Sequence, residues 1–261
     1  MKKYRSLLFV PAEDKYLAKI GKANADAYII DLEDSISDVN KKAALQRTCI
    51  FLESYDKNNL FVRINKDRYL EELKDLSMFR VGIVLPKIQS YDDYYNAEYL
   101  LNDRQVIALL ETPRAMVNLN SIAAIKWIDA LAFGAEDYTV ATGMLNTYDN
   151  LTVIKNLLVL SARAYGKLIF DTPCFQLKDE QVLEAELRQA INLGFDGKLA
   201  IHPEQVEPIN SVFDNKDIER NKEIVAIFEK SGKAVCEIDG KVYEQLHINK
   251  IKEKYVNVLD D

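Results

Sequence analysis

Short apolar runs alternate with segments of helical spacing along most of the chain, and this alternation restricts the possible folds more than any other feature. Each run is bounded by polar or turn-forming residues, which is typical of strands buried on both faces of a parallel sheet. The predicted strands are Ser6–Val10, Ala27–Leu32, Leu60–Ile64, Val81–Leu85, Val106–Leu110, Ile128–Phe133, Lys167–Phe170 and Lys198–Ile201. The predicted helices include Lys15–Asn24, Asn40–Ser54, Tyr91–Leu101, Arg114–Ile125, Tyr148–Tyr165 and Glu180–Leu193.

Eight strand–helix units within about 210 residues favour an α/β fold of the closed (β/α)8 TIM-barrel type over an open, doubly wound sheet. The 261 residues, of which 48% are hydrophobic, suffice for one large core. We therefore predict a catalytic barrel domain over residues 1–213, followed by a polar break at Asp214–Asp217.

Residues 214–261 are predicted to form a C-terminal helical extension. Its expected parts are a helix over Ile218–Ser231, a strand over Ala234–Ile238 that enters a turn at Asp239–Gly240, a last segment over Lys250–Val258 and a solvated tip at Asp260–Asp261. Because the barrel is complete without it, the extension either packs on a neighbouring subunit and contributes to that subunit's active site, or covers its own barrel.

Composition excludes several classes of protein. A net charge of −7 argues against a nucleic-acid partner, and no run approaches the roughly 18 apolar residues of a membrane span. The apolar run Ser6–Val10 is too short for the core of a signal peptide. Cys49, Cys174 and Cys236 are odd in number and widely spaced, as expected for reduced cytoplasmic thiols. Two histidines are too few for a typical catalytic zinc site, and GxGxxG, GxxxxGK[ST] and GxSxG motifs are absent.

Carboxylates follow two successive predicted strands. Glu111 ends the fifth strand, and the segment Gly134–Asp137 follows the sixth. The C-terminal ends of parallel strands meet at the edge where ligands bind, so these carboxylates could hold a hard divalent cation such as Mg2+. The alternative is that they cap the following helices.

Other strand ends carry charge as well: Asp31, Glu33 and Asp34 after the second strand, Arg63 on the third, Lys87 after the fourth, Asp171 after the seventh and His202 after the eighth. An acidic cluster with one Arg and one Lys indicates a metal site beside an anion-recognition site. Arg63 is suited to bind a substrate carboxylate in bidentate fashion. Its alternative role is an ion pair with Glu33 or Asp34.

Seven ordered segments resemble the citrate lyase beta-subunit family, part of the Mg2+-dependent CoA-ester lyases and class II pyruvate aldolases. They are Arg5–Asp14, Asp26–Leu45, Phe61–Asn65, Val84–Ile88, Ala108–Asn118, Asp129–Tyr138 and Leu193–Asn210. The resemblance implies a TIM barrel that forms trimers or hexamers, binds Mg2+, and cleaves or forms a C–C bond in a 3-hydroxyacyl thioester. An acyl carrier protein is a possible partner, as for true citrate lyase beta subunits.

The same resemblance implies roles for individual residues. Glu111 and Asp137 match the metal-binding pair, Arg63 matches the substrate-binding arginine, and the backbone of Gly134, Ala135 and Glu136 would lie near the substrate carboxylate. Asp31, Glu33 and Asp34 would hold metal-bound waters around this pair, with Lys87 in the same surrounding layer.

Lys15, Lys19, Ile201 and His202 match regions that contact the CoA moiety. His202 could instead be a catalytic base, but a structural or CoA-contact role is the better interpretation.

Two segments depart from the family pattern. Relatives often read GKMIDxPH where this chain has Gly240–His247, so that Glu244 occupies the position of an Asp that acts in a neighbouring subunit, and Leu246 replaces Pro. A longer carboxylate moves the proton-transfer atom by about one C–C bond, and a displacement near 1 Å can cost about 100-fold in rate. The first strand ends in Pro11–Ala12, where Pro-Gly is more usual.

The sequence therefore predicts an Mg2+-dependent carbon–carbon lyase that acts on a citramalyl-, malyl- or citryl-type thioester through a stabilised enolate. Arg63 would neutralise developing charge, and Glu244 of another subunit would move the proton. The alternatives are a pyruvate-type aldolase of free hydroxy-keto acids, and a carrier-dependent or non-catalytic subunit.

Overall fold

The computed structural model describes residues 4–213 and 218–255, which fall into two compact units that divide between Phe213 and Asp214. The predicted polar break at Asp214–Asp217, the end of the predicted Lys250–Val258 segment and the tip Asp260–Asp261 lie outside the described residues. Among the residues described, no helix is both long and apolar enough to cross a membrane.

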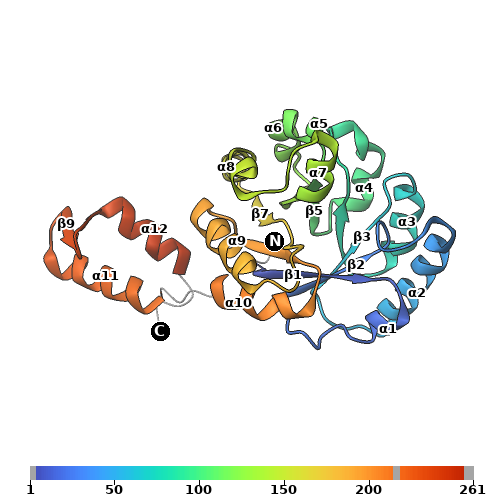
Figure 1. Cartoon of the computed structure of the whole chain (residues 1–261), viewed down its shortest axis with the longest axis horizontal. Helices are drawn as coiled ribbons and strands as arrows, with labels where there is room; N and C mark the ends of the chain where they lie inside the picture. The colour runs from blue at the N-terminus through green and yellow to red at the C-terminus, as the bar shows by residue number, and fades with distance from the viewer. Residues whose placement is uncertain (1–3, 214–217, 256–261) are drawn as a thin grey trace. The chain divides into compact units, whose positions relative to one another are not determined.

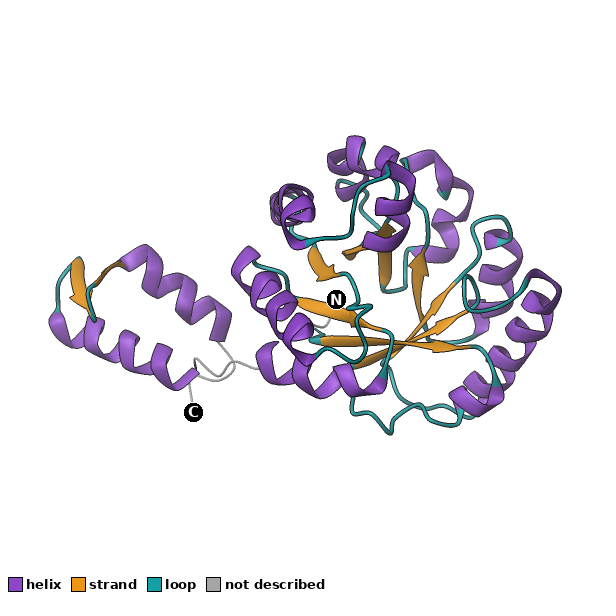
Figure 2. Cartoon of the chain, viewed as in Figure 1, coloured by secondary structure: helices purple, strands orange, loops and turns teal. Residues whose placement is uncertain are grey.

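The first unit is a closed barrel of eight parallel strands surrounded by helices (Figures 1 and 2), which confirms the predicted fold. Each strand pairs with its neighbours in sequence, and β1 pairs with β8 to close the barrel. The strands are β1 (Ser6–Pro11), β2 (Ala27–Asp31), β3 (Leu60–Arg63), β4 (Gly82–Leu85), β5 (Val106–Leu110), β6 (Ala130–Phe133), β7 (Leu168–Asp171) and β8 (Gly197–Ala200). All eight agree with the predicted strands to within two residues at each end.

The helices of this unit are α1 (Asp14–Leu17), α2 (Lys41–Glu53), α3 (Tyr69–Asp75), α4 (Glu98–Leu101), α5 (Pro113–Val117), α6 (Leu119–Ala123), α7 (Ala135–Thr142), α8 (Tyr148–Ala164), α9 (Glu180–Leu193) and α10 (Val206–Phe213). The predictions for α2, α8 and α9 are confirmed to within one residue at each end.

Three helix predictions are wrong in extent. The helix expected over Lys15–Asn24 ends at Leu17, and both Gly21 and Asn24 have a positive φ that a helix does not allow. The segment Tyr91–Leu101 forms two 3-10 turns before the short α4. The segment Arg114–Ile125 divides into α5 and α6 at Asn118, whose side chain donates to the Gln89 carbonyl at 2.8 Å.

Two hydrophobic layers hold the barrel together. Alternate strand residues face inward, because side chains point to opposite faces of a strand in turn. Ile29, Phe61, Ile107, Ala132 and Leu199 belong to this interior cluster. The residues between them pack outward against the helices in a larger cluster.

Asp171 belongs to the outer layer, so its predicted place among the charges at the active rim is wrong. Phe170 faces the barrel interior, and Asp171 therefore faces the helices. It is fully buried between Lys155 of α8, at 2.9 Å, and Lys198 of β8, at 2.8 Å. These two ammonium groups hold the pKa of Asp171 below its ordinary value even though burial alone would raise it.

The second unit contains α11 (Ile218–Ser231), β9 (Val235–Ile238), β10 (Lys241–Glu244) and α12 (Gln245–Tyr255). The predicted helix at Ile218–Ser231 and the turn at Asp239–Gly240 are confirmed. Both turn residues have positive φ, as expected for a tight hairpin turn, and β9 and β10 pair in antiparallel fashion. The strand predicted over Ala234–Ile238 is found as β9, whereas its partner β10 was not predicted.

Candidate active site

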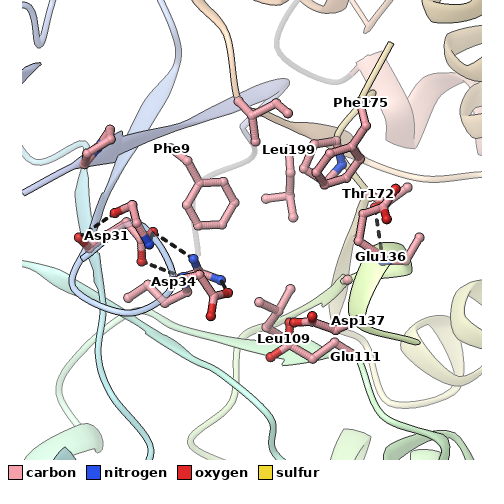
Figure 3. Close-up of a pocket in the computed structure, with 17 residues that line it drawn as sticks. Phe9, Asp31, Asp34, Leu109, Glu111, Glu136, Asp137, Thr172, Phe175 and Leu199 are labelled. Atoms are coloured by element: carbon pink, nitrogen blue, oxygen red, sulfur yellow. Dashed lines mark hydrogen bonds and ion pairs between the residues drawn. The ribbon is translucent and has the colours of Figure 1, made fainter. Parts of the chain in front are cut away.

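A pocket of about 500 Å3 opens at the C-terminal ends of the barrel strands. Asp31, Asp34 and Arg63 form one side, and Gly134–Asp137 with Thr172 form the other. Phe9, Leu109 and Leu199 provide an apolar surface between them (Figure 3). A TIM barrel carries its active site at this end of the strands.

Strand alternation explains why these polar residues reach the pocket. Asp31, Arg63 and Glu111 each follow an inward-facing apolar residue by two positions, namely Ile29, Phe61 and Leu109. A spacing of two residues keeps the side chain on the same face of a strand. The polar residues therefore cover the top of an otherwise apolar barrel interior.

Glu111 is the most deeply buried acid of the pocket, with 2% of its surface exposed. Its Oε1 accepts a hydrogen bond from the Lys87 backbone N–H at 2.8 Å. Burial raises the pKa of Glu111 to about 8, and the nearby charges of Glu33 and Asp137 add to this effect. A buried carboxylate in an acidic surrounding is stabilised when a cation binds it.

Gly134 lies directly against the Glu111 side chain. A Cβ at this position would lie 2.6 Å from the Glu111 Cβ and 2.8 Å from its Oε2. The glycine therefore leaves the space in which the Glu111 carboxylate lies.

Glu111 does not cap the next helix. The N-cap of α5 is Thr112, whose side chain accepts a hydrogen bond from Ala115 N–H at 3.1 Å. The capping alternative is thereby excluded for Glu111. Asp137 lies in the first turn of α7 and lines the same pocket.

The donor set fits Mg2+, which proteins usually hold through one or two carboxylates, while water and substrate complete the shell. Glu111 and Asp137 lie next to each other in the pocket (Figure 3), and the Asp137 carboxylate makes no hydrogen bond or ion pair with any residue that the structure describes. Over residues 4–213 and 218–255 no group of three or more His, Cys, Asp or Glu side chains could hold a metal ion. A pair of carboxylates is therefore what this pocket offers.

Arg63 is paired with acids rather than open to solvent. Its Nε and Nη2 donate to the two Asp31 oxygens at 2.7 and 2.8 Å, and its Nη1 donates to Asp34 at 3.0 Å. Glu33 lies 3.3 Å from the same Nη1. The ion-pair alternative is thus present in the structure. The guanidinium edge predicted to bind a substrate carboxylate binds Asp31 instead. Arg63 therefore offers the pocket its positive charge and the second N–H of Nη1 and of Nη2.

Asp31 has no acceptor position left for a metal-bound water, which corrects its predicted role. Besides the two bonds from Arg63, its carboxylate accepts the backbone N–H groups of Glu33 at 2.9 Å and Ser35 at 3.1 Å. A carboxylate has about four such positions. Burial alone would raise the pKa of Asp31, but the bonds and charge of Arg63 bring it below its ordinary value.

Lys87, Glu33 and Asp34 form a second group beside the pocket. Lys87 Nζ lies 2.9 Å from Glu33 and 3.6 Å from Asp34. Lys87 has a φ of 50°, which is uncommon for a residue other than glycine, and its N–H donates to Glu111. Burial lowers the pKa of Lys87, but its bond to Glu33 and the nearby carboxylates raise it well above the ordinary value.

The backbone of Gly134–Glu136 lines the pocket, but two of its three amides are already used. Gly134 N–H donates to the Leu110 carbonyl at 3.0 Å, and Ala135 N–H donates to Thr172 Oγ1 at 3.2 Å. Thr172 was not predicted from the sequence, although it directly follows the seventh strand. The amide of Glu136 remains available at the start of α7.

A second pocket of about 550 Å3 shares Phe9, Pro11 and Ile201 with the first. Of the residues predicted to contact CoA, Lys19, Ile201 and His202 line this second pocket. Lys15 does not: it lines another hollow and pairs with Glu13 at 3.1 Å. Lys22 was missed by the sequence analysis and lines the second pocket beside Lys19.

The shortness of α1 is the reason for this second pocket. A full helix over Lys15–Asn24 would cover the outward-facing side chains of β1 and β2, whereas Leu8, Val10 and Tyr28 now line the hollow. His202 Nδ1 accepts the Glu204 N–H at 3.3 Å and so caps the turn at Pro203–Gln205. This contact is consistent with the structural role of His202 rather than with a base.

Glu244 lies in the second unit, at the end of β10, where its side chain is exposed. Its N–H donates to His247 Nδ1 at 3.0 Å, and this bond caps the start of α12. A catalytic role for Glu244 stays a prediction.

The closed parallel barrel, with paired carboxylates in a pocket at the C-terminal ends of its strands, is that of a TIM-barrel protein with its candidate site at this end of the barrel. The family model described as HpcH/HpaI aldolase/citrate lyase matches residues 5–203. The chain belongs to this family, which confirms the resemblance seen in the sequence motifs.

Named relatives share most of the chain. A (3S)-malyl-CoA thioesterase from Cereibacter sphaeroides is 34% identical over 259 residues, which cover 94% of this chain and 91% of the relative. A citrate lyase subunit beta from Leuconostoc mesenteroides is 28% identical and covers 92% and 88% of the two chains. A crystal structure of CitE from Mycobacterium tuberculosis, in complex with magnesium, acetoacetate and coenzyme A, has a TM-score of 0.82 at 25% identity and covers 99% of both chains.

Proposed function

We propose that this protein is an Mg2+-dependent carbon–carbon lyase that cleaves a malyl- or citramalyl-type 3-hydroxyacyl-CoA by a retro-Claisen reaction. The observation that carries the proposal is the buried Glu111 beside Asp137, in a pocket that also contains an ion-paired arginine and a helix N-terminus. The structural neighbour crystallised with magnesium, acetoacetate and coenzyme A supports the same ligand chemistry.

Glu111 and Asp137 would hold the cation. Bound there, Mg2+ would supply a Lewis acid that polarises the substrate's oxygens and stabilises the charge of an enolate. The low exposure of Glu111 and the contact of its Oε1 with Lys87 N–H orient this carboxylate before substrate binds.

The other residues of the pocket bind and orient the substrate. The amides at the start of α7 would bind the substrate carboxylate, because the first N–H groups of a helix have no acceptor within it. Arg63 lowers the cost of bringing a further negative charge into an acidic pocket. The apolar side chains of Phe9, Leu109 and Leu199 exclude water from the reacting carbons.

The second pocket is suited to the thioester arm. It is mainly apolar inside, while Lys19 and Lys22 supply positive charge for phosphate groups, and it meets the first pocket at Phe9 and Pro11. This connection favours a substrate with a CoA-like handle over a free hydroxy-keto acid. A phosphopantetheine arm on an acyl carrier protein would use the same apolar channel, so the carrier remains an alternative donor.

Hydrolysis of the thioester is a second candidate, and the 34% identity to a (3S)-malyl-CoA thioesterase favours it. In both reactions the acidic pocket binds the same malyl group. The products differ: cleavage of the C–C bond releases acetyl-CoA and glyoxylate, whereas hydrolysis releases free CoA and malate.

One assay tests both candidates. Purified full-length protein is incubated with malyl-CoA, citramalyl-CoA and citryl-CoA, with Mg2+ or with EDTA, and acetyl-CoA and free CoA are measured by chromatography. We expect Mg2+-dependent release of acetyl-CoA, abolished by EDTA and reduced at least about 100-fold in Glu111→Gln, which loses a charged ligand of the cation.

The products separate the two candidates. Free CoA without acetyl-CoA would overturn the lyase assignment in favour of hydrolysis. If neither product forms from any of the three thioesters, both the lyase and the hydrolase assignments on free CoA esters are wrong. The thioester bound to an acyl carrier protein is then the next substrate to test.

A further inference from the structure

We propose that Thr172 is a substrate-binding residue of the first pocket, and that its hydroxyl donates a hydrogen bond to the substrate carboxylate while it fixes the start of α7. The inference rests on the proposed function, since it concerns the carboxylate of the acyl group. It adds a residue that neither the sequence motifs nor the metal pair indicates.

Thr172 is a buried residue at the edge of the pocket. It follows β7, is 4% exposed and lines the pocket. Its Oγ1 accepts the Ala135 N–H at 3.2 Å, and the preceding amide of Gly134 donates to the Leu110 carbonyl at 3.0 Å. The turn that leads into α7 is therefore attached to β5 on one side and to the end of β7 on the other.

This attachment determines which amides can bind an anion. Gly134 and Ala135 have used their N–H groups, whereas Glu136 and Asp137 lie in the first turn of α7, where backbone N–H groups have no acceptor within the helix. The partial positive charge of a helix N-terminus adds to their effect. The Glu136 carboxylate accepts a hydrogen bond from Asn146 Nδ2 at 2.7 Å, and this bond orients the Glu136 side chain.

The hydroxyl hydrogen of Thr172 is the donor that remains. A threonine hydroxyl has one hydrogen to donate and two acceptor positions. One acceptor position receives Ala135 N–H, and in the described part of the chain no acceptor is found for the hydrogen. An acceptor in the pocket, such as a carboxylate oxygen, would complete the hydrogen bonding of this buried group.

Thr172 is also the one side-chain donor on its side of the pocket, as far as the described lining residues show. Ser35 and Arg63 belong to the opposite side, and Pro173 and Phe175 next to Thr172 offer no polar side chain. In Figure 3 Thr172 lies beside Glu136, across the pocket from Asp31 and Asp34. A carboxylate bound to the α7 amides would thus meet the Thr172 hydroxyl before it meets Arg63.

The test compares Thr172→Val, which keeps the shape and removes the hydroxyl, with Thr172→Ser, which keeps the hydroxyl. Binding of pyruvate and of oxaloacetate to the full chain is measured by calorimetry at saturating Mg2+, and Mg2+ binding is measured separately without either acid. Thr48→Val is the matched control, because Thr48 is fully buried on α2 and its hydroxyl donates only to the Ala44 carbonyl at 2.9 Å.

We expect Thr172→Val to bind the acids about 10- to 100-fold more weakly, as for the loss of a hydrogen bond to a charged group. Thr172→Ser should restore most of the affinity, Mg2+ affinity should be unchanged in both variants, and Thr48→Val should bind like the wild type. Unchanged affinity in Thr172→Val would overturn the inference. So would an equal loss in Thr172→Ser, or a loss confined to Mg2+.

The proposed function fails in a different way. If the wild-type protein binds neither acid at saturating Mg2+, the proposed substrate class is wrong and this inference is wrong with it. If the wild type binds and Thr172→Val binds equally well, only the role of Thr172 is wrong.

Discussion

Gly134 shows how a single residue determines the geometry of the candidate metal site. Glu111 directly follows β5 and Asp137 lies on α7, and the two approach each other where the β6–α7 turn passes close to the Glu111 side chain. The absence of a side chain at Gly134 permits this approach. The requirement is steric and does not depend on a positive φ, because the φ of Gly134 is −100°.

We predict that Gly134→Ala weakens Mg2+ binding by about 10- to 100-fold, the usual effect of disturbing the surroundings of a metal ligand. The added Cβ would meet the Glu111 Cβ at 2.6 Å and its Oε2 at 2.8 Å, so the carboxylate must move. Calorimetric titration with Mg2+ measures the effect.

The matched control is Gly82→Ala, whose Cβ would lie 2.3 Å from the Phe61 ring in the barrel interior. It should lower stability and leave the Mg2+ affinity of the folded protein unchanged. Equal losses of affinity in the two variants would show that general loosening of the barrel, not contact with Glu111, causes the effect.

At the scale of secondary structure elements, the buried ion cluster around Asp171 connects the barrel to its outer helices. Asp171 ends β7, Lys198 lies on β8, and Lys155 lies on α8. Glu186 of α9 pairs with Lys198 at 2.9 Å. The cluster contains two positive and two negative charges, so none of the buried groups is left without a counter-charge.

We predict that Lys198→Met destabilises the protein by about 3–5 kcal/mol, since removing one member of a buried ion pair leaves an uncompensated charge. Urea unfolding measures the loss. Arg188→Ala, which breaks the exposed pair with Glu184 on α9, should leave the unfolding midpoint nearly unchanged. A midpoint for Lys198→Met equal to that of the wild type would contradict a stabilising role for the cluster.

Asp171 also shows where prediction from the sequence stops. The alternation of apolar runs and helical segments is sufficient to predict the barrel and all eight strands. It cannot say which face of a strand a terminal residue occupies, because a shift of one residue reverses the face. Glu111 and Arg63 were placed at the rim and lie there, whereas Asp171 was placed with them and faces outward.

Contacts between distant segments account for the other differences. The bond between Thr172 and Ala135 joins residues 37 positions apart, and nothing in either segment alone indicates it. The positive φ of Gly21 and Asn24 rules out a helix that continues to Asn24, and Asn210 Nδ2 donates to the Asn24 carbonyl at 3.1 Å. The bidentate pairing of Arg63 with Asp31 could not be predicted from the sequence either, because the choice among three neighbouring acids depends on the three-dimensional geometry.

At the scale of the whole molecule, the second unit carries Glu244, the residue predicted to move the proton. Among the residues of this unit that the structure describes, the buried apolar core consists of five side chains: Ile224, Val225, Phe228, Ile238 and Ile248. A unit this small buries little surface, so we expect it to gain stability by packing on another surface. Glu244 is exposed on this unit, so the carboxylate is available to a surface on which the unit packs.

We predict that Glu244 acts in the pocket of a neighbouring subunit, and mixing two inactive variants tests this directly. Glu111→Gln lacks the metal ligand and Glu244→Gln lacks the proton-transfer group, so each homo-oligomer should release acetyl-CoA from malyl-CoA at least about 100-fold more slowly than the wild type.

In a mixed oligomer, a barrel with intact Glu111 can receive an intact Glu244 from its neighbour. After subunits are exchanged by mild denaturation and refolding, up to about a quarter of the sites should be active, because random assembly places the two intact groups together at that frequency. No recovery in the mixture, with both variants folded and co-assembled, would mean that Glu244 serves the barrel of its own chain; full activity of Glu244→Gln alone would mean that another group moves the proton.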